Sequence, residues 1–318
     1  MLTSPSRAPL STWPTPLEPA PRLAQALGLA ADDLLVKRDD LTGLAGGGNK
    51  IRKLEYSCGD ALASGAEVVV TSGAPQSNHA RLTAAAAARL GLAATLVLEG
   101  EPPADERGNL VLDRLLGADV VWAGAVDADG LAAAVAAEAE RLRGQGRRVA
   151  VIPFGGSSPL AARGYVDAAR ELRQQAPDLR HVVVALGSGG TMAGLVAGLG
   201  AERVLGVHTG AVQRPAETVL ELLAGMGVRP ATPLRVREDQ LGAGYADLTP
   251  AVAAALRLAA RTEGLVLDPT YTGRALAGLV AAVADGSISP GERVVFLHSG
   301  GLPGLFGHPD LARLAQLA

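Results

Sequence analysis

The sequence predicts an α/β protein built from two open, twisted, parallel sheets. Valine-rich runs alternate with alanine-rich helical stretches, and glycine-rich turns follow many of those runs. The 318 residues also exceed the roughly 250 to 300 that one core usually holds, so we expect two lobes. Because parallel neighbours need a crossover and a helix is the usual one, this alternation predicts sheets covered on both faces.

The first half of the chain predicts four strands, each a short apolar run, with alanine-rich helices between them. In chain order the expected elements are the strand AEVVVTSG (66–73), a helix at 79–92, the strand AATLVLEG (93–100), a helix at 106–117, the strand ADVVWAG (118–124), a helix at 129–143 and the strand RRVAVIPFGG (147–156).

The same pattern continues in the second half, with helices more frequent than strands. The expected elements are a helix at 158–175, the strand HVVVALGSGG (181–190), a helix at 191–200, the strand RVLGVHTG (203–210), helices at 215–226, 250–263 and 272–285, and the strand GERVVFLHSGG (291–301).

Four strands run into glycine-rich turns, namely TSGAPQSN, PFGGSS, LGSGGT and LHSGG. In open parallel sheets the ligand crevice lies at the carboxyl ends of the strands, and glycine there lets a ligand approach the backbone. We therefore expect these four turns to face one cleft.

We expect a larger lobe made from both chain ends, residues 1–56 and 161–318. Residues 57–160 would form a smaller inserted α/β lobe that closes over the cleft and shields it from water. The proline-rich segment 4–21 is predicted to be an extended arm that wraps the domain or reaches a partner subunit.

The composition excludes several classes of protein. No run of about 18 apolar residues could span a bilayer, and a net charge of -3 with scattered basic residues argues against nucleic acid as a partner. The single cysteine, Cys58, excludes an internal disulfide and a multi-thiolate metal site. The first 21 residues carry one basic residue and no apolar run, so we expect no secretory signal and a cytoplasmic protein.

The stretch VVVALGSGGTMAGL predicts a strand, a glycine-rich turn at residues 187–191 and a helix. Backbone N–H groups and a helix N-terminus would converge there, which suits an anion such as phosphate. The turn lacks the lysine of a P-loop, and no acidic residue completes a dinucleotide-binding unit. By itself this turn fits phosphate binding and simple tight packing equally well.

Lys50 follows three glycines, residues 46–48, and begins a helical pattern. Glycines leave space above the backbone, so a flat group could lie there within reach of the lysine. A lysine amine becomes nucleophilic when a desolvated pocket or a nearby cation lowers its pKa, and Arg52 and Lys53 are close in sequence. Alone, this stretch fits a surface turn better.

Together, an imine-forming lysine and a phosphate cradle match the two ends of pyridoxal phosphate. Five stretches then resemble the family of D-cysteine desulfhydrases and 1-aminocyclopropane-1-carboxylate deaminases, which has fold type II of the pyridoxal phosphate enzymes, the class of the tryptophan synthase β subunit. These stretches are VKRDDLTGLAGGGNKIRKLEY (36–56), SGAPQSNHARLTAAAAARLGL (72–92), GSGGTMAG (187–194), LDPTYTGRALAGL (267–279) and FLHSGGLPGLFG (296–307).

The resemblance assigns roles to individual residues. It implies that Lys50 is the cofactor-binding lysine, that Asn78 lies at the ring hydroxyl of the cofactor, and that Ser77 and Asn78 bind the substrate carboxylate. Ser77 is also a candidate proton carrier, although either residue could equally be an ordinary helix cap. The phosphate would be held by Gly187, Ser188, Gly189, Gly190 and Thr191.

Two tyrosines match the pocket tyrosines of the family, Tyr245 in GAGYADL and Tyr271 in DPTYTGR. A phenol there can transfer a proton or orient the leaving group, whereas core packing is the usual fate of tyrosine and is what we expect for Tyr165. His79 matches the desulfhydrase form of the QSNH motif, at a position where the deaminase form carries glutamine.

The other histidines show no metal-ligand spacing, so we expect no metal site. His298 would lie behind the cofactor, while His181, His208 and His308 would be strand-end or surface residues.

Two positions discriminate between the family members. The deaminases carry glutamate after the second tyrosine and leucine after the histidine of the last glycine motif, where this chain has Thr272 and Ser299. A carboxylate beside the pyridine nitrogen makes the ring a deeper electron sink, which helps to open a cyclopropane. Hydroxyls suffice to expel a thiolate, so the two departures favour desulfhydrase chemistry.

The predicted reaction is α,β-elimination on a D-amino acid, converting D-cysteine to pyruvate, hydrogen sulfide and ammonia. Deamination of 1-aminocyclopropane-1-carboxylate stays open, as does elimination from cysteate, β-chloroalanine or D-serine. If Lys50 were a surface residue, the chain could instead be a phosphate- or nucleotide-binding α/β protein. The family is usually homodimeric, so a homodimer is expected. The segment 209–239 matches no family pattern and could border the substrate entrance.

Overall fold

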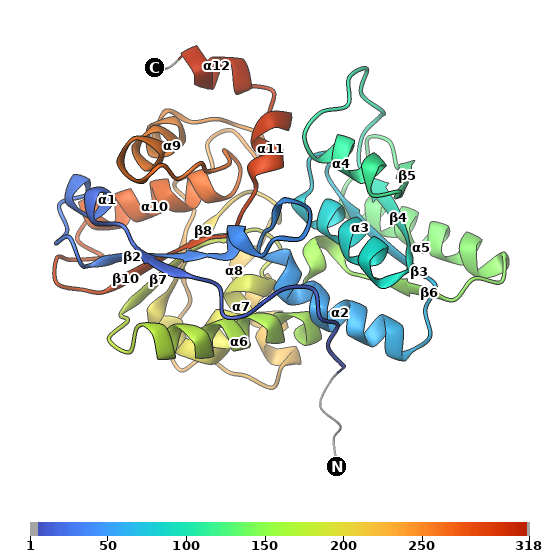
Figure 1. The fold of residues 1–318 in the computed structure, drawn as a ribbon, viewed down its shortest axis with the longest axis horizontal. Helices are drawn as coiled ribbons and strands as arrows, with labels where there is room; N and C mark the ends of the chain where they lie inside the picture. The colour runs from blue at the N-terminus through green and yellow to red at the C-terminus, as the bar shows by residue number, and fades with distance from the viewer. Residues whose placement is uncertain (1–5, 317–318) are drawn as a thin grey trace.

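A computed structural model describes residues 6–316, with two sheets side by side (Figure 1). The first five and last two residues lie outside the described part, and with them the outer ends of the predicted segments 4–21, 1–56 and 161–318. No helix in the described part is long and apolar enough to cross a membrane.

The larger sheet has six strands, and all its neighbours pair in parallel except the antiparallel edge pair β1–β2. Its central strands are buried along their whole length because helices cover both faces. In spatial order the strands are β1 (Leu17–Pro19), β2 (Leu34–Arg38), β10 (Val294–His298), β7 (His181–Leu186), β8 (Val204–His208) and β9 (Arg235–Arg237).

Two apolar cores lie on the two faces of this sheet. One face is covered by α1 (Pro21–Ala26), α9 (Pro250–Glu263) and α10 (Thr272–Ala284), and the other by α6 (Pro159–Gln175), α7 (Gly190–Leu199) and α8 (Pro215–Gly225) (Figure 1).

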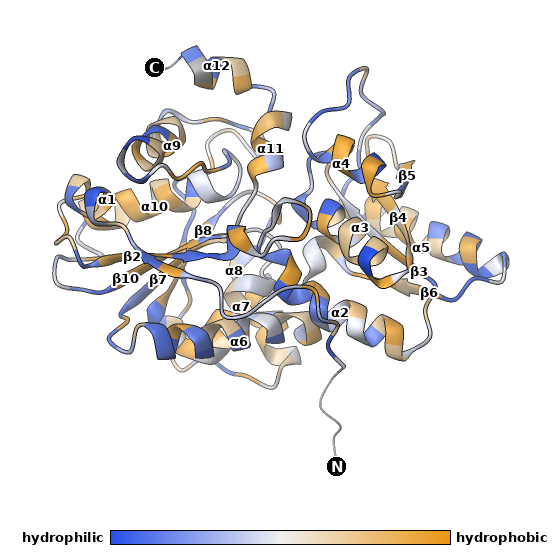
Figure 2. Ribbon diagram, viewed as in Figure 1, coloured by the Kyte–Doolittle hydropathy of each residue, from blue (hydrophilic) through white to orange (hydrophobic). Residues whose placement is uncertain are grey.

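The smaller sheet has four parallel strands, with β3 and β4 at its centre. The strands appear in orange between their covering helices in Figure 2, as expected for a doubly covered sheet. In spatial order they are β5 (Asp119–Trp122), β4 (Ala93–Leu98), β3 (Val68–Gly73) and β6 (Val149–Val151); α2 (Lys50–Ala63), α3 (Asn78–Leu90) and α4 (Asn109–Leu115) pack on one face and α5 (Ala128–Gly144) on the other.

Short elements complete the chain. They are the 3₁₀ turns η1 (Asp39–Leu41), η2 (Leu44–Gly46), η3 (Phe154–Gly156) and η4 (Ala201–Arg203), and the helices α11 (Leu302–Gly307) and α12 (Leu311–Gln316) near the C-terminus.

The prediction of an α/β fold with two parallel sheets is confirmed. Three strands of the larger sheet were not predicted, because charge or proline masks the strand pattern. β2 contains the fully buried Lys37, whose ammonium is 2.7 Å from the Glu171 carboxylate. β9 has arginine at both ends, and β1 reads Leu-Glu-Pro. The division into lobes at residues 57 and 160 stays a prediction.

The described part of the N-terminal arm wraps its own chain and lies along α2. The carboxylate of Glu55 on α2 accepts hydrogen bonds from the backbone N–H groups of Leu10 (3.0 Å) and Ser11 (3.3 Å) and from the indole of Trp13 (3.0 Å). Arg7 also pairs with this carboxylate. The arm thereby anchors the helix whose first residue is Lys50.

Candidate active site

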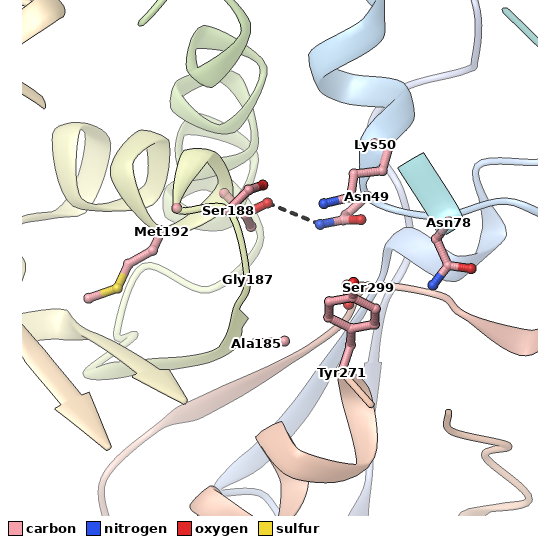
Figure 3. Close-up of a pocket in the computed structure, with 11 residues that line it drawn as sticks. Asn49, Lys50, Asn78, Ala185, Gly187, Ser188, Met192, Tyr271 and Ser299 are labelled. Atoms are coloured by element: carbon pink, nitrogen blue, oxygen red, sulfur yellow. Dashed lines mark hydrogen bonds between the residues drawn. The ribbon is translucent and has the colours of Figure 1, made fainter. Parts of the chain in front are cut away.

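A cleft at the carboxyl ends of the strands contains two adjoining cavities. The small cavity measures about 20 Å³ and the large cavity about 230 Å³, and both are lined by Lys50, Ser188 and Tyr271. The small cavity is also lined by Asn49, Asn78, Ala185, Gly187, Gly189, Thr191, Met192 and Ser299 (Figure 3), and the large cavity by Ala74, Ser77, His79, Glu99, Phe154, Gly155, Gly210, Ala211 and Tyr245.

The four glycine-rich turns predicted to face one cleft do so. Each supplies at least one lining residue, such as Ser77, Phe154, Gly187 and Ser299. The segment without family pattern also contributes, because Gly210 and Ala211 line the large cavity. The remainder of that segment forms α8 and the sheet edge β9.

The glycines before Lys50 serve a different purpose from the one expected. A Cβ on Gly47 would lie 1.9 Å from the Asp40 carbonyl oxygen, and one on Gly48 would lie 3.2 Å from that of Ser299. At these two positions the chain itself occupies the place that a side chain would take, so only glycine fits there. Both also have positive φ, so they let the loop pack closely and turn into α2.

Lys50 is the first residue of α2, and its amine points into the cleft (Figure 3). Burial lowers the pKa of this amine to about 8, although a hydrogen bond with Lys53 acts in the opposite direction. An ordinary lysine is almost fully protonated at neutral pH, whereas an amine with a pKa of about 8 is neutral in roughly one molecule in ten at pH 7. Lys50 thus has the property required of an imine-forming lysine.

The turn before α7 forms the wall of the small cavity opposite Lys50. Gly189, the residue before the helix, has a φ of 86° and no side chain to cap the first turn, and the Gly190 N–H of that turn donates to the Ser157 hydroxyl (3.1 Å). The side-chain amide of Asn49 donates to the Thr191 hydroxyl (3.0 Å, dashed in Figure 3). Gly190 begins the helix and is absent from the described lining of both cavities.

Lys53 is a site residue that the sequence analysis did not identify. Its buried amine donates to the Gly155 carbonyl and to the Ser157 hydroxyl (3.1 Å), and Ser157 in turn contacts Ser188 (2.8 Å) and accepts from the Gly190 N–H (3.1 Å). Burial, then the charge of Lys50, lowers its pKa. The spacing of three residues places both lysines on one face of α2, and that spacing was a usable signal.

Ser77 and Asn78 lie at the start of α3, where the sequence left a choice between ligand binding and capping. The Ser77 hydroxyl accepts from the Ala80 N–H (3.1 Å), so it caps the helix and also lines the large cavity. Asn78 is at the small cavity, and its carbonyl oxygen accepts from Asn109 (3.0 Å). Both residues therefore have hydrogen-bond partners within the protein and also line the cleft.

Tyr245 and Tyr271 form a pair at the large cavity. Their hydroxyl oxygens are 2.5 Å apart and their rings meet edge to face, with centroids 6.0 Å apart. Burial raises the pKa of Tyr271 to about 12 and raises that of Tyr245 well above its usual value, so both phenols are neutral at physiological pH. Tyr165 is fully buried beneath the site and donates to Asp39, which agrees with its expected packing role.

Ser299 and Thr272 are placed differently. Ser299 lines the small cavity, whereas Thr272 is fully buried beside it and is absent from both described linings. The Thr272 hydroxyl donates to the Asp268 carboxylate (2.6 Å) and accepts from the Asp268 N–H (2.8 Å). The same carboxylate also accepts from the Tyr271 N–H (2.8 Å) and so fixes the start of α10.

His79 lines the large cavity, and one ring nitrogen lies 2.8 Å from the Thr71 hydroxyl. Burial, then the charges of Lys50 and Lys53, lowers its pKa, so the ring is neutral. Within residues 6–316 no group of histidine, cysteine or acidic side chains could hold a metal ion. His298 is buried near Asp40, behind the loop that carries Lys50, and His181, His208 and His308 lie outside both described linings.

Comparisons with known proteins agree with this geometry. The family model described as "Pyridoxal-phosphate dependent enzyme" matches residues 9–300. A "Putative 1-aminocyclopropane-1-carboxylate deaminase" of Pyrococcus abyssi is 41% identical, covering 96% of this chain and 94% of that protein. A "D-cysteine desulfhydrase" of Salmonella newport is 40% identical, covering 98% of each chain. A solved structure of an "ACC deaminase homologue" superposes with a TM-score of 0.90 at 39% identity, covering 100% of this chain and 98% of the other.

Proposed function

Since this chain belongs to the family of pyridoxal-phosphate dependent enzymes, we propose that it catalyses α,β-elimination on D-cysteine, releasing pyruvate, hydrogen sulfide and ammonia. Family membership confirms the predicted cofactor and the predicted lyase class, and it removes the alternative of a nucleotide-binding protein without enzyme activity. The choice of D-cysteine and the role of each side chain are the proposal.

The residues of the cleft fit the cofactor at both of its ends. Lys50 supplies an amine with a pKa of about 8 for the aldehyde. The turn at 187–191 and the N-terminus of α7, which Lys53 supports through Ser157, supply donors for the phosphate. When bound, the cofactor serves as the electron sink for negative charge that develops at the substrate Cα.

In this proposal the chain's own groups orient the substrate and move its protons. Ser77 and Asn78 bind the substrate carboxylate at the N-terminus of α3, and the Lys50 amine exchanges the proton of Cα. The pair of neutral phenols, Tyr245 and Tyr271, faces the β-substituent and protonates the departing sulfur. Closure of residues 57–160 over the larger lobe would exclude water.

One observation carries the choice of reaction: hydroxyl groups, not a carboxylate and an apolar side chain, stand at positions 272 and 299. The buried position of Thr272 supports this, because its hydroxyl is already engaged with Asp268 and gives the cleft no negative charge. A site without a carboxylate at this position suits expulsion of a good leaving group such as a thiolate.

The first test is the visible spectrum of the purified holoenzyme during separate additions of D-cysteine, L-cysteine, D-serine, cysteate and 1-aminocyclopropane-1-carboxylate. We expect equal amounts of pyruvate and sulfide from D-cysteine. Formation of 2-oxobutyrate from the cyclopropane, without sulfide from D-cysteine, would support the alternative named by the Pyrococcus relative and would refute the proposed reaction.

The double variant Thr272→Glu, Ser299→Leu tests the two discriminating positions directly. A new carboxylate beside the small cavity should reduce kcat/KM for D-cysteine by about tenfold or more, because expulsion of a thiolate suits a site without a carboxylate at position 272. The single variant Thr272→Gln is the matched control for size. Unchanged D-cysteine turnover in the double variant would show that neither position selects the reaction.

We also propose a cytoplasmic homodimer. The exposed apolar side chains Leu302 and Phe306 on α11 and Leu115 on the neighbouring α4 support an interface between two copies, because exposed apolar groups gathered on adjacent helices favour association. Much of both helices is orange in Figure 2. The molar mass in solution checks this, and a monomer at micromolar concentration would contradict it.

A further inference from the structure

We propose that Glu99 is a specificity-determining residue that makes the cleft reject substrates with a negatively charged β-substituent. The inference rests on the proposed function, in which the large cavity receives the β-substituent of an amino acid. On this inference the enzyme accepts substrates with a neutral β-substituent, such as a thiol. It rejects substrates with an anionic β-substituent, such as the sulfonate of cysteate.

The position of Glu99 is set by the smaller sheet. It directly follows β4, and its backbone N–H donates to the Gly73 carbonyl at the end of β3 (3.1 Å). Glu99 therefore lines the large cavity from the carboxyl end of β4, next to β3, whose following turn supplies Ser77. In the sequence, Glu99 could have been identified as an acidic residue between the apolar run of β4 and Gly100.

The carboxylate is not neutralised by its surroundings. Within residues 6–316 no hydrogen bond or ion pair engages it, and no arginine is among the described residues that line the large cavity. Of the two basic residues in that lining, His79 is neutral, with a ring nitrogen near Thr71. The other, Lys50, is committed to the cofactor in the holoenzyme.

The charge of Glu99 affects the pKa values of the two tyrosines. Burial is the main reason that the pKa values of Tyr245 and Tyr271 are raised, the charge of Asp268 adds to the effect, and the negative charge of Glu99 adds a smaller contribution on both phenols. The carboxylate thus acts on the groups that face the β-substituent in the proposed reaction. An anionic β-substituent placed there would meet a like charge in a partly desolvated cavity.

Paired substrates and ligands of equal backbone but different charge test the inference. The first pair is D-cysteine and D-cysteate, compared by kcat/KM. The second pair is D-asparagine and D-aspartate, compared by the concentration that half-saturates the change in the visible band of the bound cofactor. The wild type should favour the neutral member of each pair. Glu99→Gln should shift both preferences towards the anion by at least about tenfold, which corresponds to about 1.4 kcal/mol.

Two variants serve as controls. Glu99→Asp retains the charge and should retain the preference, while Glu101→Gln removes an exposed carboxylate two residues away that lies outside the large-cavity lining and should change neither ratio. Retention of the cofactor band and of the melting temperature shows that each variant is folded.

The outcomes separate the inference from the proposed function. If Glu99→Gln leaves both preferences unchanged, or if the wild type binds D-aspartate as tightly as D-asparagine, the inference is wrong. If D-cysteine is not turned over but the second pair shows the expected shift, charge selection by Glu99 stands and the proposed reaction fails.

Discussion

The two cavities of the cleft differ in how firmly their walls are held. At the small cavity, Ser157 joins Lys53, Ser188 and the Gly190 N–H in one hydrogen-bonded cluster, and Asn49 is bonded to Thr191. The large cavity shares Ser188 with this cluster, and its lining residue Gly155 accepts from Lys53 and Ser188. Its other side chains, which come from both sheets, have few mutual bonds, chiefly the contact between the two tyrosine hydroxyls.

This difference indicates that the small cavity binds the cofactor and the large cavity selects the substrate. A preorganised set of donors suits a ligand that is the same in every turnover, namely the cofactor. A roomier cavity whose polar side chains are mostly not bonded to one another leaves substrate choice to those groups. Substitutions at the small cavity should therefore change cofactor affinity for all substrates alike, and substitutions at the large cavity should change turnover while the cofactor stays bound.

The largest effect is expected where the two cavities meet, at Lys50. In Lys50→Ala the amine that anchors the cofactor and exchanges the Cα proton is lost, so turnover should fall by about a thousandfold or more, and the band of the lysine-bound cofactor should be absent. Stopped assays of pyruvate and sulfide measure the first effect, and the visible spectrum measures the second.

The attachment site can be verified independently. The chain contains three lysines, residues 37, 50 and 53. Borohydride reduction of the holoenzyme followed by peptide mapping should place the cofactor on Lys50 alone. Attachment to Lys53, or turnover retained in Lys50→Ala, would contradict the assignment of these two neighbouring lysines.

Much of this arrangement was predictable from the sequence. Lys50, the 187–191 turn and Tyr271 could be found because each lies at the end of a strand or the start of a helix, and parallel sheets bring such ends together. Tyr245 lies in a loop and was found only through the family resemblance. Lys53 was missed because its role is set by Ser157, which is distant in sequence and comes close only through the fold.

The elements that were missed share one physical cause. Local pattern cannot reveal a buried charge whose partner is remote: Lys37 in β2 is stabilised by Glu171 on α6, and the β2 pattern therefore does not look like a core strand. Similarly, the close approach of Asp40 to Gly47 explains that glycine, but it is visible only in the folded chain.

The next effect in size concerns the wall of the small cavity. Replacing the Lys53 amine in Lys53→Met removes a buried donor and leaves its acceptors without a partner, so cofactor affinity should fall by about tenfold, the size expected for one buried hydrogen bond. The ranking of substrates should not change. Titration of apoprotein with pyridoxal phosphate, followed by the visible band, gives the affinity.

Lys37→Met is the matched control, because Lys37 is equally buried but its partners, Glu171 and Gln175, lie away from both cavities. It should lower stability and leave the cofactor affinity of the folded protein unchanged. Equal affinity in Lys53→Met and the wild type would end the view that the small cavity is a preorganised cofactor site.

The smallest of these effects is expected at the large cavity, for Tyr245→Phe. This change deletes one hydroxyl of the pair that faces the β-substituent, so kcat for D-cysteine should fall by about tenfold, near the lower limit for a proton donor, because Tyr271 remains as a second phenol. Cofactor affinity should stay within about twofold, since Tyr245 does not line the small cavity.

Tyr165→Phe, which deletes a buried hydroxyl bonded to Asp39, should lower the melting temperature without this selective loss of kcat. A large loss of cofactor affinity in Tyr245→Phe would mean that the two cavities act as one site and that their different walls do not separate binding from turnover.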